Sequence, residues 1–113
     1  MNINNLIEKI EVALVEADRL TSKSNFYTND SEPIRSTKYV LNLLRKELSQ
    51  DNKNINNRVL RAMHDLGMSS YKDFENTPLE SALNNVISLL YNELPEYKKV
   101  QPLRADFGKG DPI

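Results

Sequence analysis

Apolar residues recur at steps of three and four in four segments of this 113-residue chain, and this period limits the fold more than any other feature. Such a period places side chains on one face of an α-helix. In the first segment the apolar stripe runs from Ile3 through Leu6 and Ile10 to Leu20. No useful run alternates apolar and polar residues, so we expect no sheet. The pattern predicts an all-α fold, a small helical bundle of four main helices near residues 3–21, 33–49, 54–66 and 78–94.

Residues 66–80 carry the clearest helix boundaries in the chain. Gly67 follows the third apolar stripe, and glycine commonly ends helices in the left-handed conformation. Thr77 is a suitable N-cap for the fourth helix, with Pro78 in its first turn and Glu80 positioned to close a capping box. We therefore expect the third helix to stop at Leu66 and the connection 67–77 to hold at most a short helical turn.

Aromatic residues interrupt both of the connections that flank the central helices. Tyr71 and Phe74 lie among the charges Lys72, Asp73 and Glu75. They either plug the core from one end or contact a partner, and both interpretations stay open here. Phe26 and Tyr27 lie in the polar connection that follows the first helix, and we expect both rings to fold back on the bundle.

Two sets of residues form a pattern that bears on the class of protein: Leu66-Gly67, Lys72-Asp73-Phe74-Glu75, Thr77-Pro78-Leu79 and Ala82-Leu83, and, more loosely, Ile7, Ala13-Leu14, Arg19-Leu20, Tyr27 and Lys38. This pattern resembles that of a small family of bacterial immunity proteins. It spans roughly Ile3 to Leu83, while the connection 22–32 is longer than in the family and the tail from Pro95 has no counterpart.

Members of that family neutralise an effector of type VI secretion that destroys NAD(P)+. The resemblance implies a cytoplasmic immunity protein that binds the C-terminal domain of a cognate secreted toxin and blocks its active site. It also implies a monomer in a 1:1 complex. The toxin would be an NAD(P)+ glycohydrolase, or a ribonuclease if the pair has diverged.

The chain length suits one domain. We divide it into a helical domain, residues 1–96, and a C-terminal tail, residues 97–113, which either packs across the bundle or is disordered. There is no cysteine, so disulfides and thiolate chemistry are excluded. Charged residues interrupt the apolar N-terminal stretch at Glu8, so we expect no signal peptide and a cytoplasmic location.

Charge alternates along the chain although the net charge is only −1. Residues 1–34 hold three basic and six acidic side chains (−3), and residues 35–61 hold seven basic and two acidic (+5). Residues 62–97 hold one basic and six acidic (−5), and residues 98–113 hold four basic and two acidic (+2). Neighbouring segments could attract one another, or one acidic surface could meet a basic partner.

The second interpretation gives a predicted contact surface for a toxin with a basic cleft, because carboxylates can imitate a phosphate-bearing substrate. Tyr71 is the predicted aromatic anchor, since it is amphipathic and can remain partly wet before binding. The full predicted set of partner-binding residues is Glu11, Asp18, Tyr71, Asp73, Phe74 and Glu75.

The sequence assigns no catalytic residue, cofactor or metal site. The Asp106-Phe107-Gly108 triplet lacks the other elements of a kinase, and His64 is the single histidine. We therefore expect binding, not catalysis. Two alternative functions remain open: a helical regulatory adaptor that uses the apolar second helix, and a small nucleic-acid-binding regulator that uses the basic residues from Arg35 to Arg61.

Overall fold

The computed structural model describes residues 3–25, 27–28, 30–50, 55–94 and 97. Its four helices are α1 (Ile3–Lys23), α2 (Glu32–Ser49), α3 (Asn57–Asp73) and α4 (Pro78–Glu93). This part of the chain contains no strand, which confirms the predicted all-α bundle. None of these helices is both long enough and apolar enough to cross a membrane.

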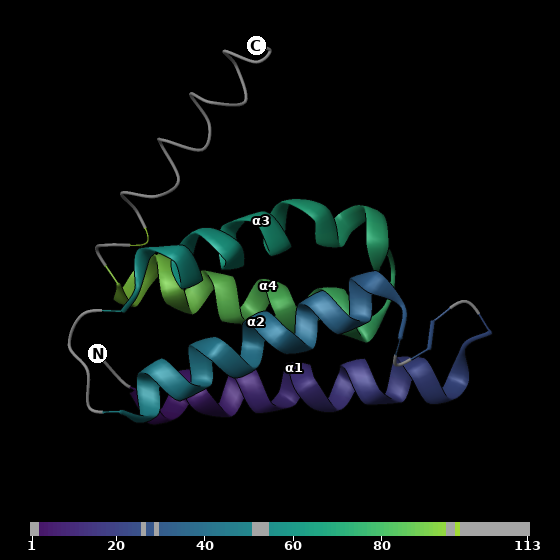
Figure 1. Ribbon diagram of the computed structural model, residues 1–113, viewed down its shortest axis with the longest axis horizontal. Helices are drawn as coiled ribbons and strands as arrows, with labels where there is room; N and C mark the ends of the chain where they lie inside the picture. Colours follow the sequence, from purple (N-terminus) through teal and green to yellow (C-terminus); the bar gives the residue numbers. More distant parts are fainter. Residues whose placement is uncertain (1–2, 26, 29, 51–54, 95–96, 98–113) are drawn as a thin grey trace, which may run out of the picture.

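Successive helices run antiparallel, up and down the bundle (Figure 1). α1 packs on α2 and α4, and α3 packs on the same two helices, so α1 and α3 lie diagonally opposite each other. The end of α1 and the start of α2 therefore lie at the same end of the bundle as the end of α3 and the start of α4 (Figure 1). The end of α2 and the start of α3 lie at the other end (Figure 1).

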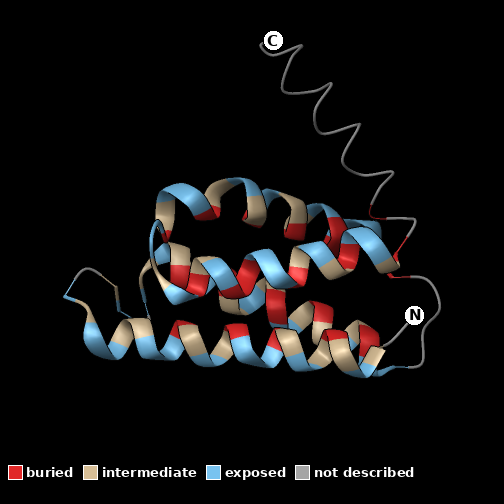
Figure 2. Cartoon of the chain, turned by 180° about the vertical axis from the view of Figure 1, so that it is seen from behind, coloured by how far each residue is buried: buried red, intermediate tan, exposed pale blue. Residues whose placement is uncertain are grey.

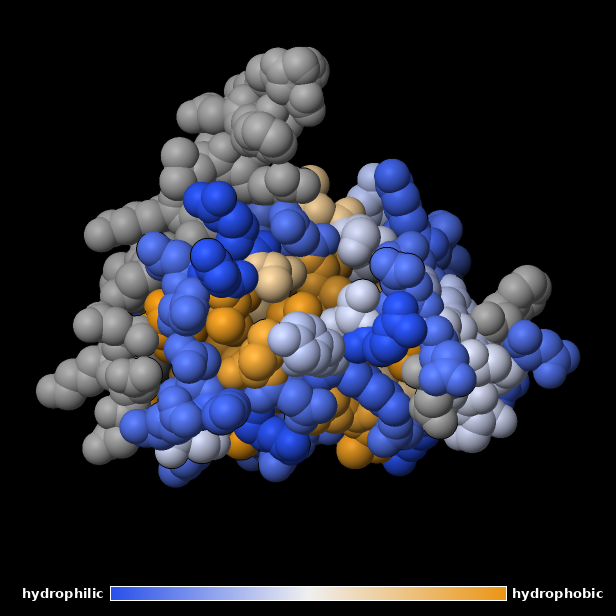
Figure 3. Space-filling model, in the orientation of Figure 1, coloured by the Kyte–Doolittle hydropathy of each residue, from blue (hydrophilic) through white to orange (hydrophobic). Residues whose placement is uncertain are grey.

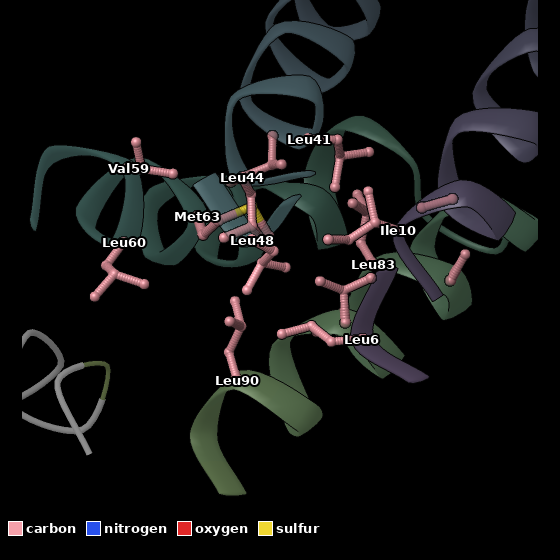
Figure 4. Close-up of a cluster of buried hydrophobic side chains, with 14 of the residues drawn as sticks. Leu6, Ile10, Leu41, Leu44, Leu48, Val59, Leu60, Met63, Leu83 and Leu90 are labelled. Carbon is pink, nitrogen blue, oxygen red and sulfur yellow. The ribbon is translucent and has the colours of Figure 1, made fainter. Parts of the chain in front are cut away.

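All four helices contribute to one apolar core. Buried faces point inward and exposed faces point outward around the bundle (Figure 2), and the close-up shows leucines from different helices meeting at the centre (Figure 4). Leu44 and Leu83 are both fully buried. The other buried apolar side chains of the helices are Leu6, Ile10, Ala13, Ala17, Ile34, Leu41, Leu48, Val59, Leu60, Met63, Leu66, Leu79, Ala82, Val86 and Leu90.

The predicted end of the third helix is wrong. α3 continues without interruption through Gly67 to Asp73, and Gly67 does not adopt a positive φ. A Cβ built on Gly67 would lie 2.4 Å from Cδ1 of Ile87, so this glycine brings α3 close to α4 instead of ending the helix. The buried side of α3 also continues past Leu66 to Ser70, and Phe74 is buried directly after the last residue of the helix.

The start of α4 follows the prediction, with one difference in its hydrogen bonds. The Thr77 hydroxyl accepts from the Glu80 amide at 3.3 Å, which confirms Thr77 as the N-cap. The Glu80 carboxylate accepts from the amide of Asn76 at 3.1 Å, one residue before the position that a capping box requires. Asn76 takes φ 62°, so this residue makes the turn that was assigned to Gly67.

Tyr97, the first residue of the predicted tail, packs on the bundle. Its side chain is fully buried, and its ring lies 6.4 Å from the ring of His64, edge to face. The remainder of the predicted tail, residues 98–113, lies outside the described residues, as do Phe26 and the proposed helix start at residue 54.

Candidate protein-binding surface at one end of the bundle

Tyr27 joins the two connections that meet at one end of the bundle. Its hydroxyl donates a hydrogen bond to the backbone carbonyl of Asp73, at the last residue of α3. The centroid of its ring lies 5.8 Å from the centroid of the Phe74 ring, and the two ring planes are tilted by 45°. A residue 46 positions earlier in the chain therefore fixes the end of α3 through one hydrogen bond and one aromatic contact.

The two aromatics of the predicted contact set have different environments. Phe74 is 1% exposed and belongs to the core, so it plugs the bundle end and is not available to a partner in this conformation. Tyr71 is 55% exposed, with the Lys72 ammonium 5.8 Å from its ring centroid. Of the two aromatic residues in the predicted contact set, only Tyr71 lies on the surface.

The carboxylates that flank Phe74 lie at the same bundle end. Glu75 is exposed and Asp73 is half-buried. Neither carboxylate forms an ion pair with the residues that the structure describes. Tyr71 and Asp73 are two residues apart on a helix, so they point to different flanks of α3. A partner that touches both must cover the tip of the bundle.

Glu11 and Asp18 of α1 form ion pairs with α2. Asp18 lies 2.5 Å from the Lys38 ammonium, and Glu11 lies 3.7 Å from the Arg45 guanidinium. The two pairs are separated by seven residues, or two turns, on each helix. The residue number falls by seven on α1 where it rises by seven on α2, as antiparallel helices require. These contacts fit the interpretation that oppositely charged neighbouring segments attract one another. The side chains of Asp18 and Glu11 nevertheless remain 66% and 57% exposed.

The structure thus brings part of the predicted set together. Asp18 lines a polar hollow of about 480 Å³ beside Tyr27, whose hydroxyl reaches Asp73. Glu11 lies two turns, about 10 Å, farther along α1. We use the name bundle-end surface for Asp18, Tyr27, Tyr71, Asp73 and Glu75.

Tyr27 is the residue of this surface that the predicted contact set missed. The sequence offered a signal, because Tyr27 is an aromatic within a polar connection and we expected its ring to fold back on the bundle. The acceptor of its hydroxyl could not be predicted, since it is a backbone carbonyl 46 residues away and every residue carries such a carbonyl.

The described residues hold no group of three histidine, aspartate or glutamate side chains that could bind a metal ion. The histidine at position 64 instead contacts the ring of Tyr97.

Comparison with known proteins adds no relative. No protein-family model, curated protein or solved structure matches the chain.

Proposed function

We propose that this protein is an immunity protein that binds a cognate secreted toxin domain through the bundle-end surface and blocks its active site. Support comes from the residue resemblance described above, which includes Tyr27, Asp73 and Glu75. The observation that carries the proposal is the 55% exposure of Tyr71 beside a bundle end whose shape is fixed by the Tyr27 bond to Asp73. Exposed aromatics on a rigid support are typical anchors of tight protein interfaces.

The mechanism is occlusion. A toxin that acts on NAD(P)+ or RNA needs a basic cleft to attract phosphates, and Asp73 and Glu75 offer carboxylates to such a cleft. Tyr71 would enter the cleft or its rim, where an amphipathic ring can bury its apolar face and keep its hydroxyl hydrogen-bonded. Because α3 and Tyr27 hold this region before binding, little conformational entropy is lost on association.

The test uses the C-terminal domain of a cognate secreted toxin, which is to be sought among the proteins encoded by the neighbouring genes. The domain is expressed in a reporter cell with the intact protein or with one of three variants, Tyr71→Ala, Asp73→Lys or Glu75→Lys, and the purified pairs are titrated by calorimetry. We expect the intact protein to restore growth and each variant to weaken binding by at least about tenfold, as for residues at the centre of an interface.

Matched controls lie elsewhere on the bundle. Tyr91 of α4 is 45% exposed, so Tyr91→Ala removes a comparable ring from another surface. Glu8→Lys reverses an exposed charge of α1 outside the bundle end. Both controls should bind like the intact protein. Full protection by all three bundle-end variants, together with loss of protection by Arg35→Glu or Arg58→Glu, would assign the toxin contact to α2 and α3 instead.

Reversals at Glu11 and Asp18 need a separate control because each also breaks an ion pair within the bundle. The double variant Asp18→Lys, Lys38→Asp restores an opposite-charge pair. A binding defect at Asp18 that the double variant retains belongs to the toxin interface. A defect that it removes belongs to the packing of α1 on α2.

A further inference from the structure

α2 presents a continuous outer stripe that the bundle-end surface does not include. Arg35, Tyr39, Asn42 and Lys46 follow one another at steps of four, three and four residues, and all four are exposed. Tyr39 is 65% exposed, the highest value among the large hydrophobic side chains that the structure describes. Beside it, a hollow of about 230 Å³ is lined by Arg35, Ser36 and Tyr39.

The flank of α2 next to this stripe is apolar. Val40 and Leu43 pack against the core but remain partly exposed, so the broad apolar side of α2 is not fully covered by its neighbours α1 and α3. The space-filling view shows apolar side chains exposed on the side of the bundle that faces the viewer in Figure 1, with hydrophilic side chains around them (Figure 3). We use the name α2–α3 face for the stripe, this flank and the adjoining start of α3.

The rim of the α2–α3 face is basic. Arg35 and Lys46 mark the two ends of the stripe on α2, and Arg58 and Arg61 are exposed at the start of α3. None of these four cations is in an ion pair with another residue of the described ranges. By contrast, Lys38 and Arg45, on the opposite flank of α2, are paired with α1. The unpaired basic charge of α2 is therefore concentrated on the side that also exposes apolar surface.

We propose that the α2–α3 face is a second docking surface, and that its occupant is an acidic amphipathic helix of a protein partner. Two antiparallel helices offer a groove into which a third helix can pack its apolar face. Tyr39, Val40 and Leu43 supply the apolar contact. Arg35 and Lys46, eleven residues or about 16 Å apart along α2, supply opposite charge to the carboxylates of a bound helix.

The exposed apolar centre favours a protein over a nucleic acid. Nucleic-acid surfaces need cations spread along the contact to neutralise phosphates. Here Lys38 and Arg45 are held by carboxylates of α1, and Val40 and Leu43 occupy the centre of the face. This proposal is independent of the toxin contact, because the α2–α3 face shares no residue with the bundle-end surface.

The experiment uses the full chain and a designed probe. The probe is a fluorescent peptide of about 18 residues, five helical turns, with leucines on one face and glutamates on the other. One matched peptide carries lysines in place of the glutamates, and a single-stranded oligonucleotide is the third probe. We expect anisotropy to show saturable binding of the acidic peptide alone, with a Kd of about 1–100 µM that rises with salt.

Variants place the binding on the proposed face. Tyr39→Ala and the double variant Arg35→Glu, Lys46→Glu should each weaken binding of the acidic peptide by about tenfold. Tyr91→Ala and Lys23→Glu remove an exposed ring and reverse an exposed cation elsewhere, and both should bind like the intact protein. Because all these residues are exposed, circular dichroism should show folded variants.

Three outcomes overturn the proposal. The first is the absence of saturable binding of the acidic peptide up to about 0.5 mM. The second is equal binding of the lysine peptide, which would mean contact without charge recognition. The third is tighter binding of the oligonucleotide than of the acidic peptide, which would assign this face to nucleic acid.

Discussion

Gly67 of α3 lies against Ile87 of α4 so closely that a Cβ on the glycine would come within 2.4 Å of the isoleucine Cδ1. The two helices therefore make close contact at a residue that carries no side chain. Ile87 is only partly buried, and the clashing atom is the far end of its side chain. The contact can consequently relax by rotation of Ile87, which sets the expected effect of a larger residue at position 67.

Gly67→Ala should change the free energy of unfolding by less than about 1 kcal/mol. Alanine gains about 1 kcal/mol of helix propensity over glycine, and a displaced Ile87 rotamer costs about the same. In an Ile87→Val background, which lacks Cδ1, the same substitution should stabilise the protein by about 1 kcal/mol. Urea denaturation of the intact protein, the two single variants and the double variant gives the coupling free energy between positions 67 and 87. Equal effects in the two backgrounds would contradict the close contact.

Thr37→Val should stabilise the bundle by about 1 kcal/mol. Thr37 is fully buried on α2, and its hydroxyl has no hydrogen-bond partner within the described part of the chain. Valine has nearly the same shape and removes the buried polar atom. The control is Ser70→Ala, because the buried Ser70 hydroxyl donates to the Gly67 carbonyl at 3.1 Å. Its removal should not stabilise, and a lower melting temperature for Thr37→Val would indicate that the Thr37 hydroxyl is paired.

Leu83→Ala should lower the free energy of unfolding by about 2–5 kcal/mol, whereas Thr77→Ala should lower it by only about 1 kcal/mol. Leu83 is fully buried between the helices, so its truncation leaves a cavity. The Thr77 hydroxyl accepts from the Glu80 amide at 3.3 Å and donates to the Phe74 carbonyl at 2.6 Å, and its removal leaves no cavity in the core. Leu44→Ala is the matched core variant on α2 and should behave like Leu83→Ala. Chemical denaturation ranks the three, and a larger loss from Thr77→Ala would contradict the core assignment.

Tyr27→Phe should lower stability by about 1 kcal/mol, because it removes one hydrogen bond and keeps the ring. The carbonyl of Asp73 loses its donor, so the end of α3 should open more often. Hydrogen exchange at the Phe74 amide, which donates to the Ser70 carbonyl at 2.8 Å, measures this opening. Tyr39→Phe is the control, since Tyr39 is 65% exposed. Unchanged exchange at Phe74 would show that Tyr27 does not hold this end.

Apolar periodicity predicted the four helices and nearly all of their inward faces, because a buried stripe is a local property of the sequence. The end of α3 was not predictable in the same way. Glycine commonly ends helices, and the residues near Gly67 in the sequence do not indicate that the side chain of Ile87 packs against it. The turn was made instead by Asn76, a residue that also tolerates positive φ.

The candidate site was predictable only in part for a related reason. The distribution of charge placed Glu11 and Asp18 in the predicted acidic contact surface, but their pairing with Arg45 and Lys38 depends on the register of two antiparallel helices. The sequence alone did not distinguish which of the two aromatics, Tyr71 or Phe74, is buried. The continuation of α3 to Asp73 is what turns Phe74 inward and leaves Tyr71 at the surface.

The Tyr27 hydroxyl donates to a main-chain oxygen of residue 73, so the bond that holds the bundle end does not depend on the side chain at that position. Every amino acid at position 73 carries the same carbonyl, so any residue that α3 tolerates there can retain the bond. The side chain at 73 can consequently change its charge while the bond from Tyr27 to the carbonyl is kept. A lineage could exchange one partner for another by substitution at this single residue, without rebuilding the end of the bundle that presents it.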